Sequence, residues 1–127
     1  MKTILVDDEM EFVSALAERL ALRGIDADWV IHPEEAISKV QEQCYDLAVL
    51  DVKMPKLDGI ALKDRLQKVC PQMRFIFLTG HGSREAFEAG QCAAGADCYL
   101  LKPLNLGELL SKIQEMGMKK KLEDDSE

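Results

Sequence analysis

Five polar residues in this chain, each placed directly after a short apolar run, could together carry out phosphoryl chemistry. They are Asp7, Asp8, Asp51, Thr79 and Lys102. Carboxylate oxygens are ligands that Mg²⁺ prefers, and a carboxylate can attack phosphorus to form an acyl phosphate. A hydroxyl and an ammonium could stabilise the charge that develops on the transferred oxygens. Brought together, these side chains would hold a divalent cation and accept a phosphoryl group.

The apolar runs are typical of strands in a parallel sheet that is buried on both faces. They cover 4–6, 47–50, 75–78 and 99–101. Such sheets bind ligands in the crevice beyond the carboxyl ends of their strands. We therefore expect the three acids, the hydroxyl and the ammonium to meet in one pocket at that edge of the sheet.

Charge favours this joint interpretation over the ordinary role of each residue. Taken singly, Asp7 or Asp8 could cap a helix, Thr79 could end a strand, and Lys102 could be an exposed cation. Three carboxylates in one pocket, however, repel one another unless a proton or cations offset their charge. Lys102 and one Mg²⁺ would together neutralise Asp7, Asp8 and Asp51.

The segments between the runs predict an alternation of five strands and five helices. A strand is expected at 27–31 and another at 98–101, and helical spacing of apolar residues covers 12–20, 33–40, 60–69, 83–94 and 106–116. The helix at 83–94 contains Gly90, which weakens it by about 1 kcal/mol relative to Ala. Right-handed crossovers then favour a single doubly wound, flavodoxin-like α/β sheet in the order 2-1-3-4-5.

Composition and charge limit the classes of function. The chain has 127 residues, 47% hydrophobic and 31% charged, enough for one domain with a proper core. We take 1–118 as this domain and 119–127 as a short charged tail. A net charge of -7 disfavours direct binding to nucleic acid or to an anionic membrane. No apolar segment approaches the roughly 20 residues that span a bilayer, and we expect a cytoplasmic protein.

The cysteines are expected to be reduced. Cys44, Cys70, Cys92 and Cys98 contain no Cys-x-x-Cys pair, and the two histidines offer little to complete a zinc site. A disulfide framework is therefore not expected, although Cys92 and Cys98 are close enough in sequence for incidental oxidation.

Four motifs in the chain resemble those of response regulator receiver domains of two-component signalling. They are Asp7-Asp8-Glu9, Asp51-Val52-Lys53-Met54-Pro55 with Asp58-Gly59, Thr79-Gly80-His81-Gly82, and Tyr99-Leu100-Leu101-Lys102-Pro103. The resemblance covers nearly everything from Lys2 to about Met116, and the motifs stand in order at the strand ends. It implies a domain that takes a phosphoryl group from a sensor histidine kinase or a histidine phosphotransfer protein.

The resemblance also implies the metal and phosphorylation sites. Asp51 would be the phosphoacceptor. Asp8, Asp51 and the main-chain carbonyl of Lys53 would ligate Mg²⁺, and Asp7 would act on the metal through water.

Further residues match the part of the family that transmits the signal. Thr79 and Tyr99 match its switch pair, and Lys102 matches its lysine. The resemblance implies a monomer or a phosphorylation-dependent dimer whose output is a protein contact on the fourth helix, the last strand and the last helix. Such a domain is not a conventional turnover enzyme, although it catalyses its own phosphorylation and slow autodephosphorylation.

Other interpretations stay open at this point. A phosphohydrolase of the haloacid dehalogenase class also forms an aspartyl phosphate, but it needs a second Asp two residues after the nucleophile, where this chain has Lys53. A pseudo-receiver would have lost an acid, the Thr or the Lys, and none is lost. The chain could also be part of a larger regulator with an output domain. The isomer of the Lys102–Pro103 bond is not fixed by residue order.

Overall fold

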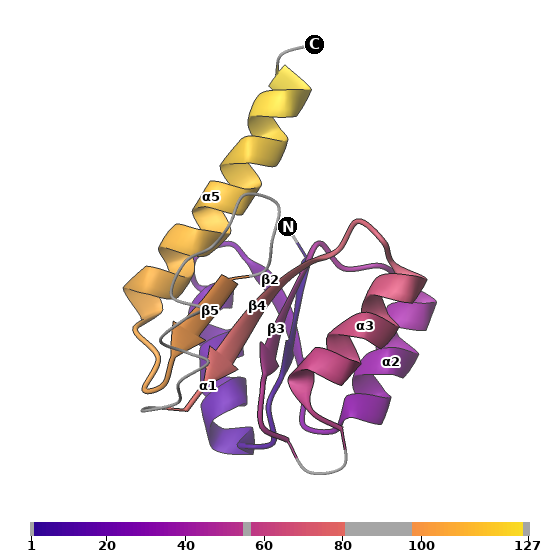
Figure 1. Ribbon diagram of the computed structural model, residues 1–127. Coiled ribbons are helices and arrows are strands. Elements are labelled where there is room, and N and C mark those ends of the chain that lie inside the picture. Colours follow the sequence, from indigo (N-terminus) through magenta and orange to yellow (C-terminus); the bar gives the residue numbers. More distant parts are fainter. Residues whose placement is uncertain (1, 55–56, 81–97, 126–127) are drawn as a thin grey trace.

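The computed structural model describes residues 2–54, 57–80 and 98–125. Within these ranges, five parallel strands form one sheet in the order β2-β1-β3-β4-β5 (Figure 1). The strands are β1 (Lys2–Val6), β2 (Asp26–Val30), β3 (Leu47–Asp51), β4 (Arg74–Thr79) and β5 (Cys98–Leu101). The order and the doubly wound topology predicted from the sequence are confirmed.

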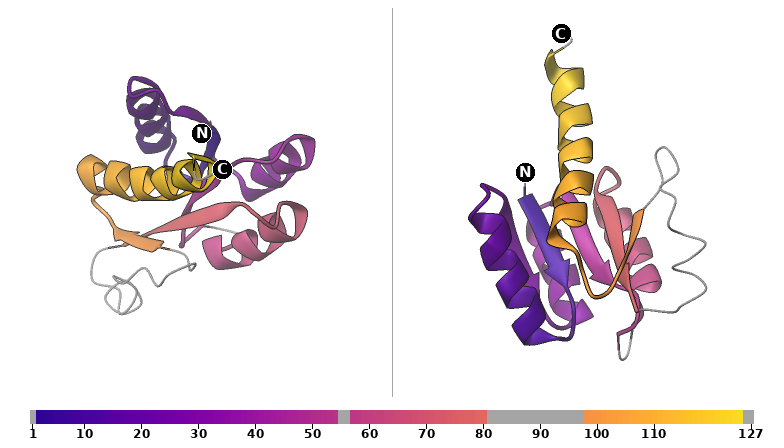
Figure 2. Two further views of the ribbon diagram at one scale, coloured as in Figure 1. Left: turned by 90° about the horizontal axis from the view of Figure 1, so that it is seen from above. Right: turned by 90° about the vertical axis from the view of Figure 1, so that its left-hand side faces the viewer.

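Four helices are described, and they cover both faces of the sheet. They are α1 (Met10–Ala21), α2 (Pro33–Glu42), α3 (Gly59–Val69) and α5 (Leu106–Asp125). Seen from above in Figure 2, α1 and α5 lie on one side of the sheet and α2 and α3 on the other. The helix predicted at 83–94 lies outside the described residues.

The closing helix is longer than the sequence pattern indicated. Its apolar positions end near residue 116, but α5 continues to Asp125 and projects beyond the sheet (Figure 1). The expected tail at 119–127 therefore belongs mostly to the helix. Lysine has a good intrinsic helix propensity, which favours continuation of the helix through 119–121.

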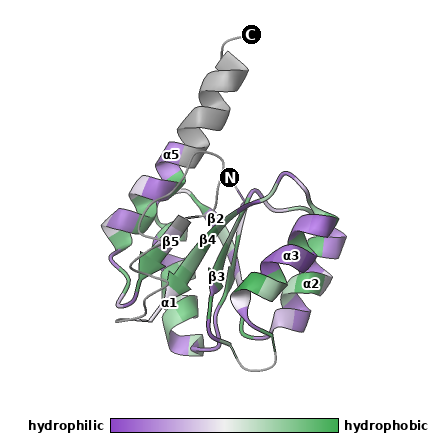
Figure 3. Cartoon of the chain, in the orientation of Figure 1, coloured by the Kyte–Doolittle hydropathy of each residue, from purple (hydrophilic) through white to green (hydrophobic). Residues whose placement is uncertain are grey.

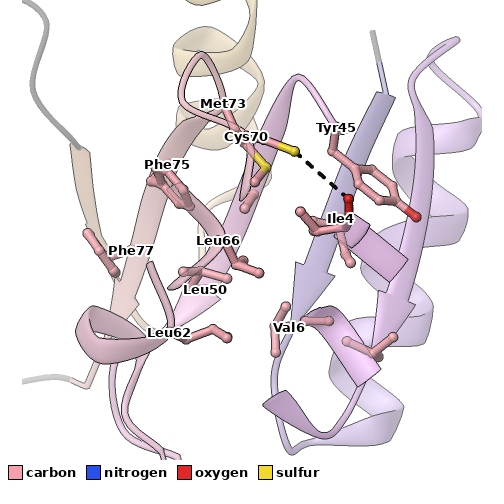
Figure 4. Packing of buried hydrophobic residues seen from close by; sticks show 14 of the residues in the cluster. Ile4, Val6, Tyr45, Leu50, Leu62, Leu66, Cys70, Met73, Phe75 and Phe77 are labelled. Atoms are coloured by element: carbon pink, nitrogen blue, oxygen red, sulfur yellow. Dashed lines mark hydrogen bonds between the residues drawn. The ribbon is translucent and has the colours of Figure 1, made fainter. Parts of the chain in front are cut away.

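Each face of the sheet has its own hydrophobic core, because alternate residues of a strand point to opposite faces. Residues such as Leu5, Val49 and Ile76 pack toward α1 and α5. Residues such as Leu50 and Phe75 pack toward α2 and α3, where Figure 4 draws the cluster at close range. Figure 3 accordingly shows strands that are mainly hydrophobic, whereas the helices around them carry both hydrophobic and hydrophilic residues.

One expectation about the cysteines was wrong. Cys44 and Cys70 are joined by a disulfide, with their Cα atoms 5.8 Å apart. The sequence pattern gave no sign of this pair because the partners stand 26 residues apart. The fold brings them together, since Cys44 precedes β3 and Cys70 ends α3 just before β4. Cys92 and the side chain of Cys98 lie outside the described part of the chain.

None of the helices in the described ranges is long and apolar enough to cross a membrane.

Candidate functional site

The pocket at the carboxyl edge of the sheet is built from residues that directly follow or end the strands β1, β3 and β5. Asp7 follows β1, Asp51 ends β3 and Lys102 follows β5. The residues two positions before each of them belong to the core on the α1/α5 side, so these three side chains leave the sheet toward that same side. The parallel sheet thus brings together residues that are up to 95 positions apart.

The three acids predicted from the sequence form one cluster. Oxygen atoms of Asp7, Asp8 and Asp51 all lie within 4.8 Å of one another. Asp7 and Asp51 are buried, whereas Asp8 is exposed. Backbone amides orient the two buried acids: the Glu9 N–H donates to Asp7 Oδ1 at 2.9 Å, and the Lys53 N–H donates to Asp51 Oδ1 at 3.3 Å.

Lys102 is the cation of this pocket, and several acids share it. Its Nζ lies 2.9 Å from Asp7 Oδ2, 3.0 Å from Glu9 Oε1 and 3.5 Å from Asp51 Oδ2. The same Nζ lies 5.2 Å from the centre of the Phe12 ring. Its backbone N–H donates to the Thr79 carbonyl at 2.8 Å, and the following bond to Pro103 is cis. One ammonium therefore faces more negative charge than it can neutralise.

The pKa values reflect this imbalance. Burial raises the pKa of Asp51 to about 6, and the nearby charge of Asp7 adds to the effect, while Lys102 opposes it only in part. Burial likewise raises the pKa of Asp7 above its usual value, against the hydrogen bond from the Glu9 N–H. For Lys102 burial works against the charged form, but the contacts with Asp7 and Glu9 outweigh it and raise the pKa.

A divalent cation fits this cluster. Asp7 Oδ2 is buried and, apart from its ion-pair contact with Lys102, has no hydrogen bond of good geometry from a described residue. A buried carboxylate oxygen without a hydrogen bond is costly, and a cation bound in the cluster would offset its charge directly or through a water ligand. The acids converge from two strand ends, and Asp8 is open to solvent. The cluster could therefore hold a hard metal ion with oxygen ligands.

Thr79 and Tyr99 lie on the other side of the sheet from the Lys102 side chain. Thr79 is buried at the end of β4, and Tyr99 is half-buried on β5 against the α2/α3 core. Tyr99 stands opposite Phe77 in the parallel register, with ring centroids 4.9 Å apart. Because Thr79 follows Phe77 by two positions, Thr79 and Tyr99 are diagonal neighbours on one face of the sheet.

Two residues of the site have roles that the sequence interpretation did not give them. Glu9, quoted only as part of a motif, makes an ion pair with Lys102 at the rim of the pocket. Gly59, expected only as a breaker, packs against β3 so closely that a Cβ there would overlap the Asp51 carbonyl oxygen. The acidic side chain of Glu9 could have indicated its ion pair with Lys102. The close approach of Gly59 to the Asp51 backbone depends on the tertiary structure and has no such signal. Asp58 caps α3 by accepting the Ala61 N–H at 2.8 Å.

Two hollows adjoin the site. A groove of about 640 Å³ lies between α1 and the start of α5, and residues such as Phe12, Ala15 and Leu104 line it beside Lys102. A second hollow of about 750 Å³ lies over β5 and α5, with Tyr99 and Leu101 in its lining. Both are open to solvent.

Comparisons with known proteins agree with this geometry. Residues 3–114 match the model of the response regulator receiver domain. The chain is 33% identical over 127 residues to the response regulator MprA of Mycobacterium avium, covering 100% of this chain and 55% of MprA. It is 32% identical over 117 residues to the transcriptional regulatory protein TcrA of Mycobacterium tuberculosis, covering 92% of this chain and 46% of TcrA. The chain thus spans about half the length of these curated relatives.

Solved structures give the same result. A receiver domain protein from Clostridium thermocellum has a TM-score of 0.81 and 29% identity, over 95% of this chain and 97% of that chain. A CheY-like receiver domain protein from Methanospirillum hungatei has a TM-score of 0.80 and 30% identity, over 94% and 96% of the two chains. The fold, the matched residues and these relatives agree: the chain belongs to the response regulator receiver domain family of two-component systems.

Proposed function

We propose that this domain is a phosphorylation-dependent switch that accepts a phosphoryl group on Asp51. The observation that carries the proposal is the pocket in which the buried Asp51 lies beside the buried Asp7, the exposed Asp8 and the shared Lys102. A carboxylate with a pKa near 6 is mostly ionised at neutral pH and is held without full charge compensation. It is therefore available as a nucleophile once a donor phosphoryl group is placed beside it.

Mg²⁺ is the cation that we propose for the acidic cluster. Asp8, Asp51 and the carbonyl of Lys53 would hold it directly, with Asp7 acting through water. When bound, Mg²⁺ neutralises charge and binds oxygens of the phosphoryl donor. The exposed position of Asp8 and the buried position of Asp7 support this division of roles.

The transfer itself uses residues of the chain. An Asp51 oxygen attacks the phosphorus atom in line, and a new O–P bond forms while the bond from phosphorus to the donor breaks. The leaving group departs with the electron pair of that bond and takes up a proton from solvent. Lys102 and the Thr79 hydroxyl would stabilise the negative charge on the transferred oxygens, which needs donors already in place. Lys102, with Nζ 3.5 Å from Asp51 Oδ2, is near enough to do so.

The proposed donor is a phosphohistidine on a sensor histidine kinase or a histidine phosphotransfer protein. Membership of the receiver domain family implies such a partner. The groove between α1 and α5 supports a protein donor, because it offers an open, partly apolar surface that adjoins Lys102 and the acidic cluster. A cytoplasmic location, where kinase domains of this kind act, belongs to the same proposal.

A phosphohydrolase of the haloacid dehalogenase class is not favoured. The general acid of that class would have to stand at Lys53, which carries a cationic side chain. Residues 3–114 match the receiver domain family instead.

We propose that the output is a protein contact on the fourth helix, β5 and α5. When the Thr79 hydroxyl turns to the phosphoryl oxygens, it vacates space for the Tyr99 ring, which is its diagonal neighbour on the same face. The hollow over β5 and α5, lined by Tyr99 and Leu101, supports a docking surface there. A partner shifts the equilibrium only by binding one of the two forms more tightly.

Amide hydrogen exchange tests this output surface. Addition of beryllofluoride and Mg²⁺, which together mimic the acyl phosphate, should change exchange at 83–94 and around Tyr99, with α1 and α2 nearly unchanged. A response confined to the loops around Asp8 and Asp51 would refute the output surface and leave the phosphorylation chemistry in place.

Intact mass spectrometry tests the phosphorylation. The chain is incubated with Mg²⁺ and acetyl phosphate, and we expect a mass increase of one phosphate that is absent in Asp51→Asn. Asp58→Asn is the matched control, because it changes an acid seven positions away that caps α3, and Asn preserves the cap. Equal labelling of Asp51→Asn and the parent would overturn the assignment.

A further inference from the structure

The bond between Cys44 and Cys70 lies at the end of the sheet opposite the acidic pocket. Cys44 stands in the connection between α2 and β3, and Cys70 is the C-cap of α3. The bond therefore joins the carboxyl ends of two neighbouring helices. It closes a segment that contains β3, the phosphoacceptor Asp51 and all of α3.

The two cysteine residues differ in their exposure to solvent. Cys44 is exposed, whereas Cys70 is 3% exposed within the α2/α3 core. Thiol–disulfide exchange requires a thiolate to approach a sulfur atom along an open path. A small disulfide or thiol in solution can therefore react at Cys44 but not at Cys70.

The structure also provides a hydrogen-bond acceptor for the Cys70 thiol of the reduced protein. The Cys70 sulfur lies 3.9 Å from the Val40 carbonyl oxygen, the contact drawn as a dashed line in Figure 4. Val40 belongs to the last turn of α2, whose carbonyls lack helical partners. A Cys70 thiol could donate its proton to that oxygen, so opening the bond would not leave a buried thiol without an acceptor.

We propose that Cys44 and Cys70 form a reversible dithiol–disulfide site that responds to low-molecular-weight disulfides such as oxidised glutathione. The Cys44 thiolate attacks the glutathione disulfide, forms a mixed disulfide and releases one glutathione thiolate. The Cys70 thiolate then attacks the Cys44 sulfur and releases the second glutathione. The two cysteine thiols lose two electrons and two protons in all, and one glutathione disulfide is reduced to two glutathione molecules.

The consequence of oxidation would be a more stable α2–β3–α3 unit. Closing this segment restricts the unfolded chain, and stabilisation rises with the length of the closed loop. Asp51 stands at the far end of β3 from Cys44, so the bond does not contact the acidic cluster. We therefore expect oxidation to raise thermal stability and to leave acetyl phosphate labelling of Asp51 within twofold.

Differential alkylation and peptide mass mapping of the full chain test the site. After treatment with oxidised glutathione under native conditions, a peptide pair joined through Cys44 and Cys70 should be found, and dithiothreitol should remove it. The pair should persist in the Cys92→Ser/Cys98→Ser variant, which removes the other two cysteines. Free thiols at both positions in excess oxidant, or pairing of Cys44 with Cys92 or Cys98, would overturn the proposal.

Single variants test the order of the two steps. In a Cys92→Ser/Cys98→Ser background, Cys70→Ser should retain one glutathione on Cys44, because no second thiol resolves it. Cys44→Ser should take up none in the folded state. Oxidation of the background variant should raise Tm by roughly 10 °C. Equal glutathione uptake by both single variants, or an unchanged Tm, would contradict the proposed site.

Discussion

The two ends of the sheet differ in how completely their charged side chains are paired. At the amino end several described acids have a close partner: the Lys2 N–H donates to Asp46 Oδ2 at 2.8 Å, and Lys2 Nζ lies 3.3 Å from Asp26 Oδ2. The Tyr45 hydroxyl there donates to Asp28 Oδ2 at 2.6 Å. At the carboxyl end, Lys102 is shared among three carboxylates.

This difference separates what stabilises the fold from what serves the chemistry. The amino end carries the matched polar pairs just described and the Cys44–Cys70 bond. The carboxyl end holds Asp51 buried with a raised pKa, a state that costs folding free energy. Binding of a cation reduces that cost. The uncompensated negative charge that destabilises the pocket therefore also favours cation binding.

The largest expected effect is on metal affinity, and it tests the roles of the two acids that follow β1. Asp8→Ala should weaken Mg²⁺ binding by about 100-fold or more, because it removes a proposed direct ligand, and Asp7→Ala by about tenfold. Titration calorimetry measures both. Asp58→Asn, an acid outside the cluster, is the control and should bind as the parent does. Equal losses in the two alanine variants would mean that their roles are misassigned.

A smaller effect is expected where the backbone supports the carboxyl end. Gly59→Ala places a Cβ against the Asp51 carbonyl, so β3 or α3 must shift. We expect a loss of about 1–3 kcal/mol in the free energy of unfolding, measured by urea denaturation. Gly80→Ala is the matched control, since no atom of the described residues lies within 4 Å of a Cβ at that position. A Gly59→Ala variant as stable as Gly80→Ala would show that this close approach is not needed.

The sequence predicted the sheet order and the pocket because both depend on local patterns. Apolar runs that end at polar residues determine where strands stop, and parallel strands then place those residues at one edge. Asp7, Asp51 and Lys102 were identified in this way, and the structure brings them into contact.

Features that depend on which residues lie close together in the folded chain were not predicted from the sequence. The Cys44–Cys70 pair was missed because nothing local marks two cysteines separated by a strand and a helix. The full extent of α5 to Asp125 was not predicted, because the apolar spacing that marks the helix in the sequence ends near residue 116. The contact of Gly59 with the Asp51 backbone depends on how α3 begins against β3, and residue order does not specify that distance.

The raised pKa of Asp51 determines how the free energy of unfolding depends on pH. The group has a pKa near 3.8 when unfolded and about 6 in the fold, so the folded state binds more protons between these values. The free energy of unfolding therefore falls as pH rises through that window, and the loss is complete above about pH 6. A shift of this size corresponds to roughly 3 kcal/mol as an upper figure.

The central claim, that the carboxyl end carries charge which the fold does not compensate, is tested most directly by urea unfolding of Asp51→Asn in EDTA. At pH 7.5 this variant should be more stable than the parent by about 2–3 kcal/mol, and the gain should shrink at pH 4.5. Tyr45→Phe at the amino end, measured in parallel, should instead lose about 1 kcal/mol with its hydrogen bond to Asp28. An Asp51→Asn variant that is less stable than the parent at pH 7.5, or whose gain is the same at both pH values, would contradict the account.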